Sequence, residues 1–322
     1  MRNRLTRAIG VAAPLAFLAV LPIIGEAQTS EAKHQQAVLV TGASTGIGRK
    51  ITERLAADGY FVYAGARKDA DLKALGAIKN VQAIRLDVTS IEDIDNAVAT
   101  VTKTGRGLYG LVNNAGVGSR GSFAEMRPEE FDLMMAVNVY GPYRVTKAFA
   151  PLVVAQKGRI ITIGSISGIL ARSQLGAYAM TKHAVEAYTD SLAQQMADAG
   201  VQVSVVEPGN YESEITRNAL KRLGKVDEKL ADRSQYKPPD EVAEAVEHAL
   251  FEPNPKRRYL VVPNQEEAEI TIRKQIEQLV QLNEGQRYTY DRNTLIKMLD
   301  EALAGSRPKT ILPDAPAKGV AR

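Results

Sequence analysis

The 322-residue sequence contains no cysteine. Disulfide bonds, thiolate chemistry and cysteine-ligated metal sites are therefore excluded. Its three histidines, His34, His183 and His248, are far apart in the chain and lack the spacing of metal ligands. We therefore predict no metal site.

A concentration of basic charge is also lacking. The formal net charge is +4, and the basic residues are scattered without a basic stripe that carries interleaved aromatic residues. Nucleic acid is therefore not an expected partner. Hydrophobic residues make up 45% of the chain, which is ordinary for a globular protein with a sizeable core. The length suits one large α/β domain or two small ones.

An apolar run lies near the N-terminus. Three arginines precede it, the run covers residues 8–24, and the small residues Gly25 and Ala27 follow it. The run is short for a full membrane span. This layout predicts a signal peptide or a membrane anchor in residues 1–27, with an exported or membrane-associated main domain. If that segment is a misassigned start or packs on the domain, a cytoplasmic location is the alternative.

A β-α-β pattern begins at residue 36. An apolar strand over 37–40 is followed by the glycine-rich turn TGASTGIG, an amphipathic helix and a second strand over 60–64. A glycine turn between a strand and a helix directs backbone N–H groups and the helix dipole at a phosphate group. The turn spacing is G-x-x-x-G-x-G, which differs from the common G-x-G-x-x-G. The cofactor-binding candidates in this turn are Gly42, Ser44, Gly46 and Ile47.

The end of the second strand indicates which dinucleotide binds. An acidic residue there would bind the ribose 2′-hydroxyl, whereas a basic residue would accommodate a 2′-phosphate. The chain reads Gly65-Ala66-Arg67-Lys68, without an acid. We therefore predict NADP(H) as the cofactor, with Arg67 as the main phosphate contact. NAD as the cofactor, with Arg67 as a solvated surface residue, is the alternative.

Residues 165–182 carry a further pattern with chemical use. Tyr178 and Lys182 are spaced i, i+4, so both lie on one face of a helix. A cation about 4 Å from a phenol, at an effective dielectric of about 20, favours the phenolate by roughly 4 kcal/mol before desolvation. That energy equals about three pKa units. The pair predicts a tyrosine acid/base, although an exposed helical pair without chemistry is the alternative for so short a motif.

Seven motifs occur along the chain in register: TGASTGIG, LDV, LVNNAG, VNVYG, the serine of IGSISG, YAMTK and VEPG. Their order and spacing resemble the short-chain dehydrogenase/reductase family over about residues 38–262. The stretch TKHAVEAYTDSL resembles the hydroxysteroid and retinol dehydrogenase branch of that family. The resemblance implies a single doubly wound (Rossmann) α/β domain with a seven-stranded, largely parallel sheet.

The resemblance also implies roles for individual residues. Asn138 matches the asparagine that kinks its helix and holds a water in the proton relay, and Ser165 matches the substrate-orienting serine. Tyr178 matches the acid/base. Lys182 matches the residue that lowers the tyrosine pKa and binds the nicotinamide ribose. Cofactor contacts are implied for Asp87, Val88, Asn114, Ala115, Gly116, Tyr178, Lys182, Pro208 and Gly209.

The expected function is hydride transfer between NADP(H) and a carbonyl/secondary-alcohol pair. The expected substrate is a small apolar alcohol or ketone of steroid, retinoid or lipid type, because of the branch that the chain resembles. One alternative is a catalytically silent dinucleotide-binding regulatory or scaffold protein. Another is an epimerase or C=C reductase on the same fold.

The predicted organisation has four parts. Residues 1–27 form the signal or anchor, and 36–263 form the dinucleotide-binding catalytic domain. Residues 264–304 form a helical extension with apolar stripes, which typically pack on their own domain or on a second subunit. A homo-oligomer is therefore expected. The composition of 305–322 predicts a disordered tail.

Overall fold

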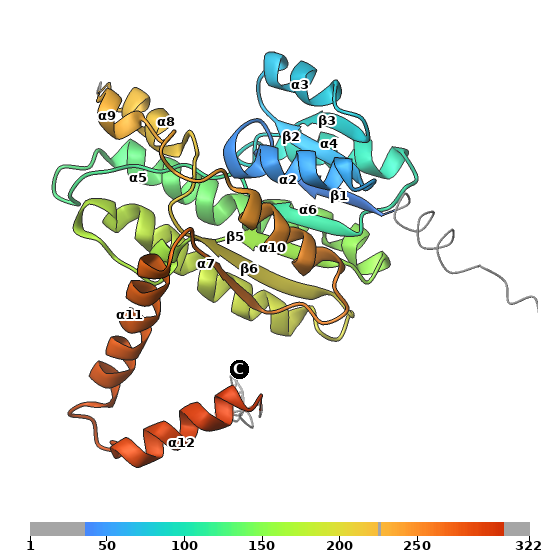
Figure 1. The fold of residues 1–322 in the computed structure, drawn as a ribbon. Helices are drawn as coiled ribbons and strands as arrows, with labels where there is room; N and C mark the ends of the chain where they lie inside the picture. The colour runs from blue at the N-terminus through green and yellow to red at the C-terminus, as the bar shows by residue number, and fades with distance from the viewer. Residues whose placement is uncertain (1–35, 225–226, 306–322) are drawn as a thin grey trace, which may run out of the picture.

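The computed structural model describes residues 36–224 and 227–305. Its centre is a seven-stranded sheet in the order β3-β2-β1-β4-β5-β6-β7, in which every neighbouring pair is parallel (Figure 1). The doubly wound fold predicted from the motifs is thus confirmed. The strands are β1 (Ala37–Val40), β2 (Phe61–Ala66), β3 (Val81–Arg85), β4 (Gly110–Asn113), β5 (Arg159–Ile163), β6 (Gln202–Pro208) and β7 (Arg258–Val261).

Helices cover both faces of the sheet, which is why its strands are apolar on both sides. In β1, Val38 and Val40 join the core on one face, while Leu39 joins the core on the other. The first face is covered by α2 (Gly46–Ala57), α3 (Asp69–Gly76) and α10 (Asp240–Phe251). The second face is covered by α4 (Ile91–Lys103), α6 (Gly141–Ala155) and α7 (Gly176–Gln195).

Shorter helices surround the carboxyl edge of the sheet. Helix α5 (Pro128–Met135) runs into a π-helical turn at Ala136–Tyr140, which leads directly into α6. Helices α8 (Ile215–Arg222) and α9 (Glu228–Ala231) follow β6. In Figure 1 these two helices lie beside α5, above the same edge of the sheet.

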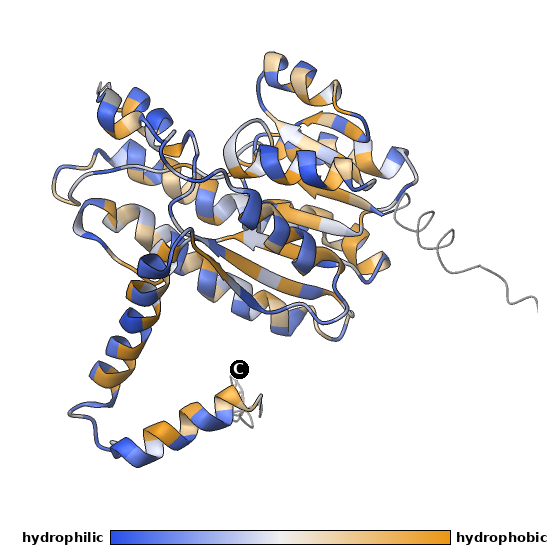
Figure 2. Ribbon diagram, in the orientation of Figure 1, coloured by the Kyte–Doolittle hydropathy of each residue, from blue (hydrophilic) through white to orange (hydrophobic). Residues whose placement is uncertain are grey.

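The C-terminal extension projects from this domain. Helix α11 (Gln265–Asn283) leaves the end of β7 and points away from the sheet, and α12 (Arg292–Leu303) turns across its far end (Figure 1). Polar and apolar residues alternate along both helices, as the colours in Figure 2 show, and apolar residues of α11 remain exposed. Ile272 is 53% exposed and Leu282 is 76% exposed.

Two predicted segments fall wholly or almost wholly outside the described residues. The signal or anchor at 1–27 does so, and so does the tail after residue 305. Within the described ranges, no helix combines the length and apolar character needed to cross a membrane.

Candidate active site

A cleft of about 1510 Å³ opens at the carboxyl edge of the sheet. Loops that follow six strands contribute to its wall, as expected for ligand sites in doubly wound folds. Every catalytic and cofactor-binding residue predicted above lines this cleft, except Asn138. The structure therefore brings together residues that are spread over the sequence between Gly42 and Gly209.

The glycine-rich turn forms one end of the cleft. Gly42 and Gly46 have φ angles of +65° and +55°, which favour glycine. A Cβ atom at Gly42 would lie 2.8 Å from the Cα atom of Ala115. Asn114 ties the turn to β4, because its Nδ2 donates to the carbonyl oxygens of Thr41 at 2.9 Å and Gly42 at 3.1 Å. The turn is thus a rigid cradle that larger residues would fill, which fits a dinucleotide phosphate.

Arg67 and Asp87 lie at the nucleotide end of the cleft. The Arg67 side chain is 61% exposed, and its Nη1 is 3.5 Å from the Asp87 carboxylate. Burial acts to raise the pKa of Asp87, but hydrogen bonds from Thr89 and the charge of Arg67 outweigh it and lower this pKa. An exposed guanidinium at the end of β2 fits a 2′-phosphate.

Tyr178, Lys182 and Ser165 form the other end. Tyr178 and Lys182 lie one turn apart on α7, as the i, i+4 spacing predicts, with the lysine Nζ 5.7 Å from the tyrosine ring centre. Ser165 follows β5, and its hydroxyl lies near enough to Tyr178 to lower the pKa of the phenol. Lys182 Nζ donates to the carbonyl oxygen of Ile163 at 2.8 Å. The ammonium is thereby held beneath the loop that carries Ser165.

Burial has a larger influence on the pKa of Tyr178 than any nearby charge. Burial raises the pKa of Tyr178 to about 12, against the opposing influence of the Ser165 hydrogen bond and the Arg233 charge. Burial also lowers the pKa of Lys182 to about 8. The pKa shift expected from the spacing of Tyr178 and Lys182 was a value before desolvation, and desolvation is the larger effect here.

Asn138 lies behind the cleft wall, in the π-helical turn. Its Oδ1 accepts from the backbone N–H of Val117 at 2.8 Å, and its Nδ2 donates to the Val117 carbonyl at 2.8 Å. Nδ2 also donates to the hydroxyl of Thr181 at 3.0 Å. The side chain therefore joins the loop after β4 to α7, next to the tyrosine and the lysine. The π-helical turn agrees with the expected kink.

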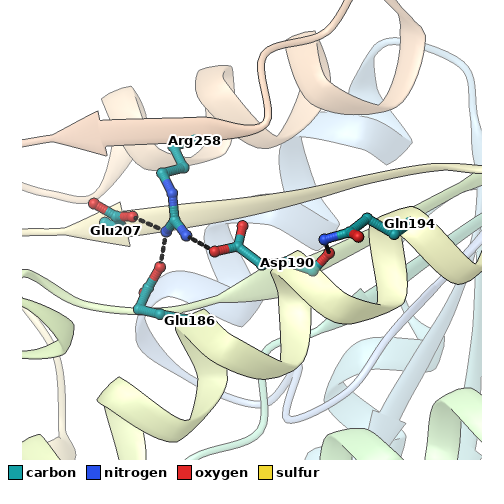
Figure 3. A network of polar contacts seen from close by, with 5 residues as sticks. All are labelled: Glu186, Asp190, Gln194, Glu207 and Arg258. Atoms are coloured by element: carbon teal, nitrogen blue, oxygen red, sulfur yellow. Dashed lines mark hydrogen bonds and ion pairs between the residues drawn. The ribbon is translucent and has the colours of Figure 1, made fainter. Parts of the chain in front are cut away.

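A partly buried charged cluster lies along the middle of α7 (Figure 3). Arg258 forms ion pairs with Glu186, with Asp190 at 2.5 Å and with Glu207 at 3.1 Å. Burial, and then the charge of Glu207, raise the pKa of Glu186 to about 8, although Arg258 opposes this shift. The cluster lies beneath the Ser165 loop, because a Cβ atom at Gly168 would be 2.8 Å from Glu186 Oε1.

A second support joins the root of α11 to the turn after β6. The Glu267 carboxylate accepts from the backbone N–H of Asn210 at 2.9 Å and from its Nδ2 at 2.8 Å. Asn210 follows Pro208 and Gly209, the residues expected beside the nicotinamide. The extension is therefore mechanically linked to the cofactor end of the cleft.

Sequence reasoning missed several of these residues. Glu186 stands four residues after Lys182, so the helical spacing alone could have indicated it. Arg233, which also lines the cleft, lies in a segment without periodicity. No sequence signal pointed to it.

The fold and the cleft define a dinucleotide-binding α/β protein with a tyrosine, a lysine and a serine at the carboxyl edge of its sheet. A family model described as short chain dehydrogenase matches residues 36–224, which is more than half of the chain. The chain therefore belongs to the short-chain dehydrogenase/reductase family. Dehydrogenases and reductases that act on CH–OH groups are its relatives.

Individual relatives agree with this assignment. The chain is 34% identical to the mitochondrial D-beta-hydroxybutyrate dehydrogenase of Mus musculus over 64% of its own length and 63% of the relative's. It is 36% identical to retinol dehydrogenase 5 of Mus musculus over 56% of its own length and 58% of the relative's. It thus spans about three fifths of the length of these relatives.

A solved structure gives the same family. A short-chain dehydrogenase from Burkholderia cenocepacia in complex with NADP superposes with a TM-score of 0.63 at 25% identity. The match covers 76% of this chain and 94% of that one. The part left uncovered is consistent with an extension outside the common fold.

Proposed function

We propose that this protein is an NADP(H)-dependent oxidoreductase that interconverts a carbonyl and a secondary alcohol. The observation that carries the proposal is the joint placement of Tyr178, Ser165 and Lys182 at one end of a cleft whose other end is a glycine turn. A silent binding protein would not need a hydroxyl, a phenol and an ammonium assembled at that position.

In this proposal the side chains of the protein donate and relay the proton. When bound, NADPH supplies a hydride to the carbonyl carbon. The Ser165 hydroxyl hydrogen-bonds the carbonyl oxygen and orients it, and Tyr178 donates its phenolic proton to that oxygen. Lys182 returns a proton towards Tyr178, and Asn138 helps to hold the relay. In the oxidative direction the same proton leaves the alcohol oxygen for Tyr178.

The raised pKa of Tyr178 is compatible with this role. A phenol with a pKa of about 12 is protonated at neutral pH, so it is in the form that donates during reduction. Serine and lysine would then stabilise the phenolate that forms as the proton leaves.

The decisive experiment is the Tyr178→Phe variant. It removes one hydroxyl and keeps the ring, so ketone reduction with NADPH should fall at least about 100-fold, which is the low end for a general acid. NADPH binding, followed by fluorescence titration, should stay within about threefold because the glycine turn is untouched. Retained turnover in this variant would exclude the proposed role of Tyr178. If the wild type binds NADPH but turns over no ketone or alcohol in a broad panel, the result would favour the silent regulator.

We also propose NADP(H) rather than NAD(H), with Arg67 at the 2′-phosphate. The support is an exposed guanidinium at the end of β2, where an acid would be needed for NAD(H). Arg67→Ala should raise the KM for NADPH by about tenfold, because one charge-assisted contact is lost. The KM for NADH should not change. A wild type that prefers NADH would refute the assignment.

For the substrate we propose a molecule with an apolar body. The support is the apolar side chains in the cleft wall, among them Leu170, Leu175 and Ile215. Steroid, retinoid and lipid-like ketones should therefore be reduced with lower KM values than acetone. Equal KM values across that series would contradict this choice.

For assembly we propose a homo-oligomer formed through the C-terminal extension. Ile272, Ile276 and Val280 line one side of α11 and are about half exposed. Helix α11 has four acidic and two basic residues, which disfavours an anionic lipid surface as its partner. A matching stripe on a second copy is the occupant we propose. The variant with both isoleucines changed to Glu should be a monomer by light scattering, whereas a monomeric wild type would contradict the proposal.

We further propose that residues 1–27 are a signal or anchor, that 36–263 form the catalytic unit and that 264–304 form an extension to it. The support is the Arg-flanked apolar run and the change in packing after β7. Fractionation of expressed protein without detergent tests the first point. A soluble cytoplasmic product with an intact N-terminus would contradict it.

A further inference from the structure

Arg233 is a cleft residue that forms no ion pair with any side chain in the described part of the chain. It follows α9 and lines the same cleft as Tyr178 and Ser165. Its Nη2 donates to the carbonyl oxygen of Tyr211 at 3.1 Å, and its guanidinium lies 3.9 Å from the centre of the Tyr236 ring. These two contacts fix the plane of the guanidinium. Neither of them neutralises its charge.

No carboxylate among the described residues lies in direct contact with Arg233. Among the side chains that the structure describes, no carboxylate forms an ion pair with Arg233 or with Arg120. Glu267 is the described acid whose charge reaches Arg233, and both of its oxygens already accept from Asn210. By contrast, the neighbouring Arg222 is paired with Glu130 at 3.5 Å.

Arg120 adds a second positive charge to the same space. It is half-buried, lines the cleft and lies in the loop that follows β4. Burial lowers the pKa of Arg233, and the charge of Arg120 lowers it further. An anion bound in the cleft near both of these half-buried guanidinium groups would be stabilised by their charges.

The position of these charges relates them to the reacting atoms. The Arg233 charge acts on the Tyr178 hydroxyl, where it opposes the effect of burial on the pKa. Arg67 and Lys68 lie at the nucleotide end, where the 2′-phosphate would bind. Arg233 and Arg120 are therefore available to bind the substrate that Tyr178 protonates.

We infer that Arg233 and Arg120 bind a carboxylate of the substrate, so that the substrates are oxo acids and the corresponding hydroxy acids. This inference rests on the proposed function and makes its substrate class more specific. The planar guanidinium matches a carboxylate with two parallel hydrogen bonds. The apolar wall then receives the carbon chain, and the carboxylate is unchanged while the oxo group accepts a hydride and a proton.

The test compares matched acids and esters. Acetoacetate, 3-oxooctanoate and 5-oxodecanoate are each reduced with NADPH beside their own methyl esters, using the full-length protein. At least one acid should exceed its ester in kcat/KM by about tenfold or more, as expected when a charged hydrogen bond is formed. Arg233→Ala should lower kcat/KM for that acid roughly 10- to 100-fold and change the ester by less than about threefold.

Two further variants control for structure and for charge. Arg49→Ala removes a guanidinium of α2 whose ion pair with Glu53 lies outside the cleft, and it should change neither acid nor ester. Arg233→Lys retains the charge without the planar fork and should restore part of the acid activity. Ester turnover reports whether each variant is folded.

The outcomes separate this inference from the proposed function. If esters are reduced through Tyr178 but no acid is preferred, or if Arg233→Ala lowers acid and ester equally, the substrate inference is wrong and the oxidoreductase proposal stands. An equal loss with a raised KM for NADPH would assign Arg233 to a cofactor phosphate instead. If neither acids nor esters are reduced, both proposals fail.

Discussion

Replacing Glu186 by Gln should change how the stability of this protein depends on pH. The cluster around Arg258 places three carboxylates against one guanidinium, so that it would carry a net charge of −2 if all were ionised (Figure 3). The Glu186 side chain is only 13% exposed, and its Oε1 is buried without a hydrogen-bond partner among the described residues. The amide in Glu186→Gln has nearly the shape of the protonated carboxyl and cannot ionise.

The sign of the effect follows from the raised pKa of Glu186. Its ordinary value is 4.5, and in the folded protein it is about 8. Between these values the folded state binds more protons than the unfolded state, so the free energy of unfolding falls as the pH rises. The whole shift corresponds to about 5 kcal/mol, an upper bound because Glu207 shares the proton.

Urea unfolding at pH 5 and pH 9 measures this difference. At pH 5 the wild type and Glu186→Gln should agree within about 1 kcal/mol, because both carry a neutral group there. At pH 9 the variant should be more stable by about 2 to 5 kcal/mol. The matched control Glu53→Gln, in an exposed pair with Arg49, should follow the wild type at both values. Parallel stability curves for the wild type and Glu186→Gln would refute the reasoning.

Three further substitutions test other parts of the site. Asn138→Ala removes three buried hydrogen bonds and should lower the free energy of unfolding by about 2 kcal/mol or more, which an unchanged melting temperature would contradict. Gly42→Ala places a Cβ atom 2.8 Å from the Cα atom of Ala115 at a residue with a φ of +65°. It should lower the free energy of unfolding by about 1 to 3 kcal/mol and weaken NADPH binding. Unchanged affinity in a titration would show that the turn does not bind the cofactor phosphate. Glu267→Ala removes both hydrogen bonds to Asn210 and should raise the KM for NADPH while the melting temperature changes little. A lower melting temperature with an unchanged KM would leave Glu267 with a structural role.

In the helical extension, local sequence patterns predict the helices but not the surface against which they pack. A helical extension was predicted over 264–304, and the structure has two helices there, each with its own periodicity and with caps at Asn264 and Asp291. Which surface covers their apolar stripes was not predictable. Packing depends on the partner, and the stripes are exposed in the single chain.

The sequence by itself determined the order of the elements, the parallel sheet, the glycine turn and the residues at its carboxyl edge. The glycine turn and the i, i+4 spacing of Tyr178 and Lys182 are local properties, whereas the seven-stranded parallel sheet was implied by the resemblance to the short-chain dehydrogenase/reductase family. The tertiary structure decided the electrostatics. Glu186 meets Arg258 across 72 positions of sequence, and burial of the whole site moves the pKa of Tyr178 upwards. Desolvation and long-range charge pairs exist only once the chain has packed, so the chemistry of this cleft is a property of the folded molecule.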